Sequence, residues 1–97
     1  MNKADEEVIM YLALRKYGIK AQLSMLSEES TELSLATQKF VRSNCDICLL
    51  SQLQEEIADV EIMIEQIKLA YPSAFRNKVM EFRDFKMRRL KQRIENS

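Results

Sequence analysis

Two short sequences, Glu28-Glu29-Ser30-Thr31-Glu32 and Glu55-Glu56-Ile57-Ala58-Asp59, set the pattern that the rest of this 97-residue chain follows. Each carries two carboxylates three residues apart, within a segment whose apolar residues recur at helical spacing. Residues three apart are neighbours on the surface of an α-helix, with roughly 5–6 Å between their Cβ atoms. Each segment can therefore direct two oxygen ligands toward one point.

In both segments an acid lies on the face that the apolar residues define. At about 100° per residue, Glu29 falls near the middle of its apolar stripe and Glu32 at its edge. Glu56 lies inside the margin of the second stripe, and Asp59 lies just beyond it. A carboxylate on a face meant for a core is costly unless it is paired or binds a metal. Because two helices each place a carboxylate on an apolar face, the sequence predicts a cation that both helices bind. The apolar stripes consist of Met25, Leu26, Leu33, Ala36 and Phe40 in the first segment and Leu53, Ile57, Val60, Met63, Ile64 and Ile67 in the second.

The alternative is that these acids are ordinary charges on solvated helix surfaces, where pairs at this spacing are common. That interpretation suits Glu61 and Glu65, which lie opposite the second apolar stripe. It fits Glu29 poorly, because solvating this side chain would also expose Leu26 and Leu33. We therefore favour functional acids.

Composition predicts a single all-α domain spanning residues 1–97. Hydrophobic residues make up 46% and charged residues 31% of the chain, which is typical of a globular protein. One Gly and one Pro leave few breaks between residues that favour helix. No apolar run approaches a membrane span, and the acidic N-terminal sequence is unlike a signal peptide. We expect no membrane partner and a cytoplasmic location.

Four helices are expected, over residues 4–17, 19–42, 49–70 and 73–94. Gly18 ends the first helix, Pro72 ends the third, and Ser73 is the expected cap of the fourth. Amphipathic helices with short connections form a bundle. The second helix would span about 36 Å, too long for its partners within one chain to cover. We therefore expect a four-helix bundle-like fold that is completed by homo-oligomerisation.

Charge is unevenly distributed along the chain, although the formal net charge is zero. Residues 1–75 carry a net charge of −5 and residues 76–97 a net charge of +5. A basic last helix can bind an acidic part of its own chain, a polyanion, or a second copy of the chain. Cys45 and Cys48 are interpreted as loop or helix-start thiols, because a single C-x-x-C pair in a chain without His cannot complete a zinc site.

Oxygen ligands without His or Cys favour Mg²⁺, or Mn²⁺ in its place. Carboxylates around such an ion are a familiar requirement for chemistry on a polyphosphate, since the ion neutralises phosphate charge and lowers the pKa of an attacking water. An acid that is not a ligand can then accept the proton of that water.

The two acid pairs resemble the metal motif of the MazG-like nucleoside triphosphate pyrophosphohydrolases. Glu29-x-x-Glu32 is followed, after 23 intervening residues, by Glu56-x-x-Asp59. The sequence from Gln22 to Leu33 is similar to the first metal helix of that family. The sequence from Glu55 to Met63 is similar to the second in its short phage and bacterial members, and the residues from Lys86 to Arg93 resemble their C-terminal tail.

The resemblance implies a Mg²⁺-dependent enzyme of the MazG-type fold that hydrolyses a nucleoside or deoxynucleoside triphosphate to the monophosphate and pyrophosphate. It also implies a homodimer or homotetramer whose neighbouring subunits close the site. By the same resemblance, Glu29, Glu32, Glu56 and Asp59 would be the metal ligands. One of these, or a doublet partner such as Glu28 or Glu55, would position the water.

Candidates for binding the rest of the substrate are Gln22, Phe40, Lys39 and Arg42. The amide of Gln22 can hydrogen-bond a base edge, or it is a satisfied polar residue at the end of the bundle. Phe40 can stack on a base, as can Tyr11 or Tyr17, although an aromatic residue at helical spacing is also typical of a core. Lys39 and Arg42, or basic residues of the last helix, can reach phosphates.

Two other functions remain open at the level of sequence. A non-enzymatic helical module would dimerise through the same apolar stripes. A nucleic-acid-binding protein would use the basic residues from Arg83 to Arg93, although zero net charge argues against nucleic acid as the partner.

Overall fold

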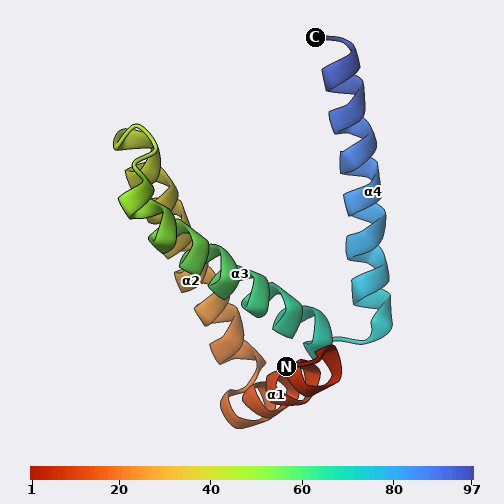
Figure 1. The fold of residues 1–97 in the computed structure, drawn as a ribbon. Coiled ribbons are helices and arrows are strands. Elements are labelled where there is room, and N and C mark those ends of the chain that lie inside the picture. The colour runs from red at the N-terminus through yellow and green to blue at the C-terminus, as the bar shows by residue number, and fades with distance from the viewer.

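The computed structural model describes residues 1–97 and consists of helices without strands, which confirms the all-α prediction (Figure 1). Each of the four predicted helices is present, and its ends lie close to the expected residues. A single 3₁₀ turn, η1, precedes the third α-helix. The elements are α1 (Lys3–Tyr17), α2 (Ile19–Arg42), η1 (Ile47–Leu49), α3 (Leu50–Ala70) and α4 (Ser73–Glu95).

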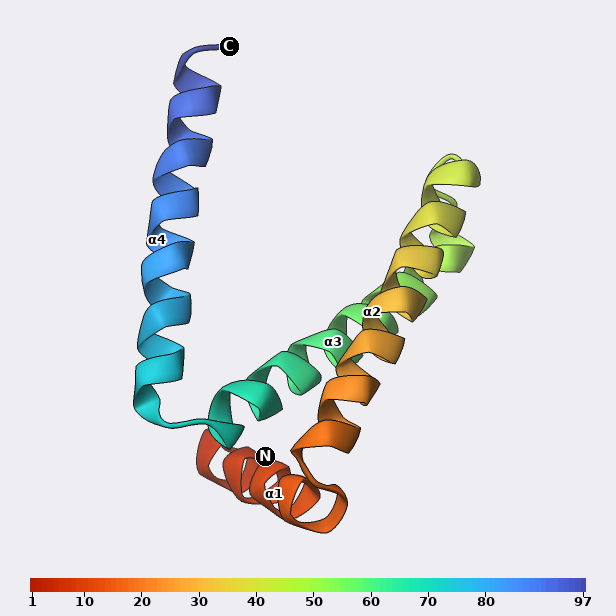
Figure 2. The ribbon, with the colours of Figure 1, turned by 180° about the vertical axis from the view of Figure 1, so that it is seen from behind.

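The helices α2 and α3 form an antiparallel hairpin, and α1 packs across the end of it that is remote from the turn (Figures 1 and 2). The core of the chain is small. Only four apolar side chains are buried, and they come from all three of these helices: Met10, Ala36, Met63 and Ile67. One hairpin and one crossing helix thus supply all of the buried core.

Gly18 separates α1 from α2 because of its backbone conformation. Its φ of 86° and ψ of 158° lie in a region that is essentially reserved for glycine. The Gly18 N–H donates to the Leu14 carbonyl at 2.9 Å, and the Gly18 carbonyl accepts from the Gln22 N–H at 3.2 Å. One residue therefore ends α1 and begins α2, as the sequence predicts.

The connection between α2 and α3 is held by its own polar side chains. The Ser43 hydroxyl donates to the Phe40 carbonyl at 2.8 Å and accepts from the Asp46 N–H at 3.0 Å. The Asp46 carboxylate caps η1 by accepting from the Cys48 N–H at 2.9 Å. Cys45 and Cys48 are free and exposed in this connection, which matches their interpretation as loop thiols.

The link from α3 to α4 is short and extended. Tyr71 has φ −113° and ψ 161°, as expected for a residue that precedes proline. The expected capping role of Ser73 is wrong: Pro72 is the N-cap, its carbonyl accepts from the Phe75 N–H at 2.9 Å, and Ser73 is already helical. The Tyr71 and Phe75 rings stack with centroids 4.7 Å apart, so that they pack together across this link.

Beyond its first turn, α4 leaves the other helices (Figures 1 and 2). None of its residues is buried, and the Arg76 guanidinium reaches only the Lys68 carbonyl, at 3.4 Å. The radius of gyration is 16.4 Å, against about 12.5 Å for a typical domain of this length. A single chain therefore does not close the four helices into a bundle. None of the helices combines the length and the apolarity needed to cross a membrane.

Candidate functional site

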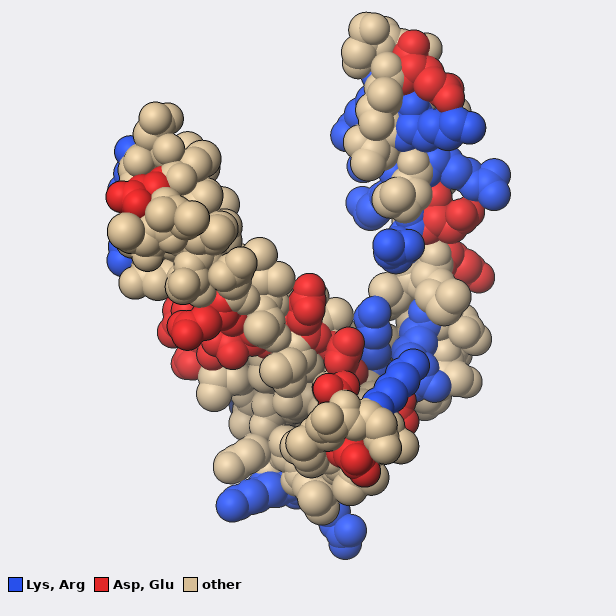
Figure 3. Space-filling model, viewed as in Figure 1, with Lys and Arg blue, Asp and Glu red and all other residues tan.

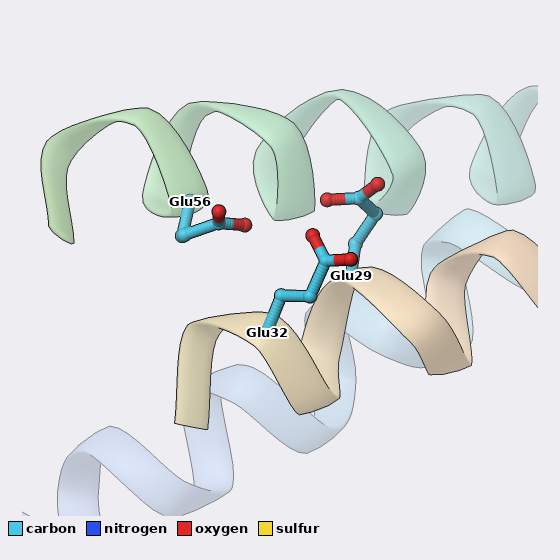
Figure 4. Close-up of side chains that lie close together, drawn as sticks. All are labelled: Glu29, Glu32 and Glu56. Atoms are coloured by element: carbon cyan, nitrogen blue, oxygen red, sulfur yellow. The ribbon is translucent and has the colours of Figure 1, made fainter. Parts of the chain in front are cut away.

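Three of the predicted acids converge between α2 and α3. Glu29 and Glu32 of α2 and Glu56 of α3 each place a carboxylate oxygen within 4.8 Å of the others. Figure 4 shows these side chains pointing toward one another across the hairpin. The spacing of three residues puts the two α2 carboxylates on one side of the helix, and the antiparallel pairing brings Glu56 opposite them. We call Glu29, Glu32 and Glu56 the acid cluster.

The acid cluster is only partly exposed and lacks a partner. Glu29 and Glu56 are half-buried, while Glu32 is exposed. The Oε2 atoms of Glu29 and Glu56 are buried and accept no hydrogen bond. The ion pairs of the chain, Lys78–Glu81, Arg88–Asp84 and Lys91–Glu95, all lie within α4. No basic side chain therefore compensates the charge of the cluster.

Electrostatics within the cluster disfavour ionisation of two of its carboxyls. Partial burial raises the pKa of Glu29, and the negative charges of Glu32, Asp59 and Glu56 raise it further. Partial burial likewise raises the pKa of Glu56, followed by the charges of Glu32 and Asp59. Loss of solvation and repulsion between like charges both favour the protonated form. A bound cation would reverse this preference.

Asp59, the fourth predicted ligand, lies beside the cluster rather than within it. It is exposed, but its charge acts on both Glu29 and Glu56. Because Asp59 acts on two of the three cluster carboxyls, it is within reach of the same site.

The structure leaves the two predicted water-positioning acids outside the cluster. Glu28 and Glu55 are both exposed. Each precedes a cluster residue and so points about 100° away from it around the helix. The charge of Glu55 still contributes to the raised pKa of Glu56. Both carboxylates flank the site without closing on it.

The cationic and aromatic candidates lie farther along α2. Lys39 and Arg42 are exposed, and Phe40 is half-buried next to the turn. They follow Glu32 by about two to three helical turns, a distance on the order of 10–15 Å. Within one chain they are not brought to the acid cluster.

Sequence reasoning selected Gln22 but missed Gln66. Both glutamines are buried, with 7% and 8% of their surface exposed. The Gln66 amide nitrogen donates only to the Met63 sulfur, at 3.9 Å, and its oxygen has no partner. Gln66 lies beyond the margin of the apolar stripe of α3, next to Asp59 around the helix. That shared side with Asp59 was the available signal.

The two glutamines occupy the same level of the hairpin. The charge of Asp59 acts on Glu29 and the charge of Glu32 acts on Glu56, which indicates that these residues face each other across the antiparallel helices. Gln22 precedes Glu29, and Gln66 follows Asp59, by two helical turns, about 10 Å along the axis. The carboxylates thus lie at one level of the hairpin and the amides at another, with apolar side chains such as Leu26 and Met63 between them. We call these two levels together the polar line.

Comparison of the chain with family models, with curated proteins and with solved structures finds no match in any of the three.

Proposed function

We propose that the protein is a cytoplasmic, Mg²⁺-dependent nucleoside triphosphate pyrophosphohydrolase of the MazG-like type. The observation that carries the proposal is the convergence of Glu29, Glu32 and Glu56, with two buried carboxylate oxygens that have no partner. A hairpin that needed only stability would place apolar side chains here, because unpaired buried carboxylates are destabilising.

The donor set fits a hard divalent cation. All of the nearby donors are carboxylate oxygens, which Mg²⁺ and Mn²⁺ prefer. Glu29, Glu32 and Glu56 would hold the ion, and Asp59 would join them through a change of rotamer. When bound, the ion would neutralise phosphate charge and lower the pKa of a water molecule.

The reaction proposed is attack of water on a phosphorus atom of the triphosphate, with cleavage of the bond between the α and β phosphates. The water oxygen forms a new bond to one of the two phosphorus atoms, and the bond from that phosphorus to the oxygen bridging the α and β phosphates breaks. The bridging oxygen leaves with the other product, so that pyrophosphate and the nucleoside monophosphate separate. The proton of the water passes to a carboxylate that flanks the cluster, Glu28 or Glu55, and from there to solvent. Both side chains are exposed and free to exchange that proton.

The amide end of the polar line supports recognition of the base. In a nucleotide, the distance from the phosphates to the base is about the same as the distance from the acid cluster to Gln22 and Gln66. A nucleotide whose phosphates lie at the cluster would therefore place its base near these two amides. The Gln66 oxygen, which has no partner, is free to accept a hydrogen bond from a base, and the Gln22 amide offers both a donor and an acceptor. Phe40 would stack on the substrate, and Lys39 and Arg42 would bind phosphate, from a neighbouring subunit, because their own chain holds them away from the cluster.

The assembly that we propose is a homodimer or a homotetramer. The open arrangement of α4 supports it, since one chain leaves a complete helix without a packing partner. A second copy would complete the bundle that the sequence predicts.

The test is direct. The purified protein is incubated with each nucleoside and deoxynucleoside triphosphate and Mg²⁺, and the products are separated by chromatography. Pyrophosphate and monophosphate in equal amounts support the proposal, whereas release of orthophosphate alone contradicts it. Glu29→Gln and Asp59→Asn should abolish turnover with helicity intact, while Glu81→Gln, the same chemical change on α4, should leave it unchanged. If no triphosphate is turned over, a helical interaction module is the better account.

A further inference from the structure

The exposed surface of α4 is unlike that of a solvated helix. Although no residue of α4 is buried, it carries large apolar side chains that are between 45% and 68% exposed: Met80, Phe82, Phe85, Met87, Leu90 and Ile94. Single exposed apolar residues are ordinary, but a series of them along one helix marks an interaction surface.

One side of α4 combines apolar and basic residues. At about 100° per residue, a sector about 120° wide holds the apolar side chains Phe82, Leu90 and Ile94 and the basic side chains Arg83, Lys86 and Arg93. The three acids of α4, Glu81, Asp84 and Glu95, lie on the opposite side, where each pairs with a basic residue of the same helix. We call the first sector the α4 docking face. Its three positive charges have no ion-pair partner.

A groove between α1 and α3 has the complementary character. It measures about 500 Å³ and is lined by Ile9, Met10 and Ile62 together with Glu6, Glu61 and Glu65. Ile9 and Ile62 are half exposed, at 50% and 46%. No basic residue lines this groove. Figure 3 shows the same contrast on a larger scale, with acidic atoms over α2 and α3 and basic atoms along α4.

The α4 docking face cannot reach the groove of its own chain. The groove lies near the end of α3 from which α4 starts. Arg76, in the first turn of α4, already lines the neighbouring groove with Glu6 and Glu65. The docking face begins at Phe82 and ends at Ile94, about 9–27 Å beyond Arg76 along a straight helix. Figures 1 and 2 show that α4 runs away from α1 and α3 over this length.

The exposed area of the chain matches what a second copy would cover. The chain exposes 7,898 Å², whereas a monomeric protein of 11.4 kDa typically exposes about 5,800 Å². The excess is about 2,100 Å² per chain, and two copies that cover it bury about 4,200 Å² in total, within the range of obligate homodimers. A second copy also carries both the α4 docking face and the α1–α3 groove. The α4 of each chain can therefore bind in the groove of the other.

We propose that the α4 docking face binds in the α1–α3 groove of a second copy, and that the two copies exchange α4 reciprocally in a twofold dimer. Phe82, Leu90 and Ile94 then cover Ile9, Met10 and Ile62, and Arg83, Lys86 and Arg93 meet Glu6, Glu61 and Glu65. This inference rests on the homo-oligomer proposed above but not on the hydrolysis. A dimer that turns over no nucleotide would contradict only the enzyme.

The first experiment measures mass and dissociation constant by sedimentation equilibrium. The native chain should have at least twice the 11.4 kDa of one copy. The triple variant Arg83→Glu/Lys86→Glu/Arg93→Glu should dissociate at least a hundredfold more readily. The control, Arg88→Glu/Lys91→Glu, reverses two charges outside the docking face, on the side of the α4 acids, and should dissociate as the native protein does. A monomeric native chain, or equal weakening of both variants, would overturn the proposal.

The second experiment uses the reciprocity of the exchange. In the variant Glu6→Lys/Glu61→Lys/Glu65→Lys the groove is basic, so this variant and the α4 variant should each be monomeric. A mixture of the two should form a one-to-one heterodimer, because both contacts in it join opposite charges. Circular dichroism of each variant before mixing reports its helicity. Helical variants that fail to combine would refute docking in this groove. Retention of monomeric native protein on duplex DNA, lost with salt, would assign the α4 face to nucleic acid instead.

Discussion

The fold disfavours ionisation of Glu29, although the metal-binding role that we propose for it requires the ionised form. Its pKa is raised by burial and by Glu32, Asp59 and Glu56, and its Oε2 atom has no partner. Glu29→Gln removes one negative charge and supplies an amide donor, so the metal-free variant should melt at a higher temperature than the native protein. It should lose turnover by more than the 10–100-fold that is typical of residues that only support a ligand.

Thermal unfolding in chelator, with and without added Mg²⁺, measures the first effect, and pyrophosphate release measures the second. Mg²⁺ should raise the melting temperature of the native protein but not that of the variant. The control Glu81→Gln removes only a solvent-exposed ion pair with Lys78 and should change neither quantity. A variant that melts lower and still turns over substrate would show that Glu29 is a structural residue.

The raised pKa values also predict how the stability of the metal-free protein depends on pH. Above the ordinary glutamate pKa of 4.5, Glu29 and Glu56 keep their protons longer in the folded state than in the unfolded state. The folded state therefore binds more protons, and stability falls as the pH rises from about 4.5 through the raised pKa values. Above them the destabilisation is complete.

The measurement is the melting temperature in chelator across this range of pH. The double variant Glu29→Gln/Glu56→Gln, which cannot titrate at these positions, should show a flatter profile than the native protein. Identical profiles for the two proteins would mean that the two carboxyls titrate normally in the folded state.

A substitution at Gln66 can distinguish a structural role of this residue from a role in recognising the base. A buried amide oxygen without a partner destabilises a protein by about 1–3 kcal/mol, so Gln66→Leu should stabilise the free protein by up to that amount. If the Gln66 amide recognises the base, KM for the preferred triphosphate should be higher in Gln66→Leu than in the native protein. The value of kcat for the other triphosphates should be unchanged. Denaturant unfolding and a KM series over the nucleotides measure the two effects. A stabilised variant with an unaltered preference would limit Gln66 to the fold.

For single residues, the sequence was informative where a charged side chain lies on an otherwise apolar face of a helix. Glu29 and Glu56 are recognisable as acids on apolar stripes, and the structure brings both to one point. Whether Asp59 lies inside the cluster depends on its rotamer, which the sequence does not specify. Gln66 was missed because an amide beyond the margin of a stripe conflicts with its surroundings less than a charge does.

Among the elements, the boundary at Gly18 gives the sharpest prediction. Its φ of 86° and ψ of 158° are strained for any L-residue, although an added Cβ would meet nothing within 4 Å. Gly18→Ala should therefore destabilise the protein by about 1–3 kcal/mol through backbone strain alone. Denaturant unfolding measures the change.

Two controls separate the destabilisation caused by backbone strain at position 18 from other effects of a substitution. Lys20→Ala, at an exposed position two residues away, should change stability by less than about 0.5 kcal/mol. D-Alanine at position 18, introduced by chemical synthesis, adopts a positive φ without strain and should be neutral or stabilising. If L-alanine proves as stable as glycine, α1 and α2 are joined by some other conformation.

The helices themselves followed from periodicity and from two breaks, Gly18 and Pro72. Both act on their own backbone and need no knowledge of the rest of the fold. The cap of α4 was misassigned because Pro72 and Ser73 can both precede a helix, and the stacking of Tyr71 on Phe75 depends on tertiary geometry. The direction of α4 was beyond prediction for the same reason, since a helix with no buried residue carries no signal for its orientation on its own chain.

For the molecule as a whole, the small core means that folding and assembly should be coupled. With six buried residues in 97, a chain of this kind resembles half of a domain, and α4 lacks the packed face on which helices of this length depend in water. Mass action then requires the melting temperature to rise with protein concentration. For a dimer of two such chains, the entropy of unfolding predicts a rise of about 3 °C for each tenfold increase in concentration.

Scanning calorimetry over a range of concentrations tests this coupling. The native protein and the variant Arg88→Glu/Lys91→Glu should both show the rise. The variant Arg83→Glu/Lys86→Glu/Arg93→Glu should melt lower, at a temperature that does not depend on concentration, and should lose the helical signal of α4 first, because nothing then covers Phe82, Leu90 and Ile94. A native melting temperature that stays constant as the protein is diluted would mean that one chain is stable with α4 in solvent. Burial of these three side chains would then contribute nothing to folding.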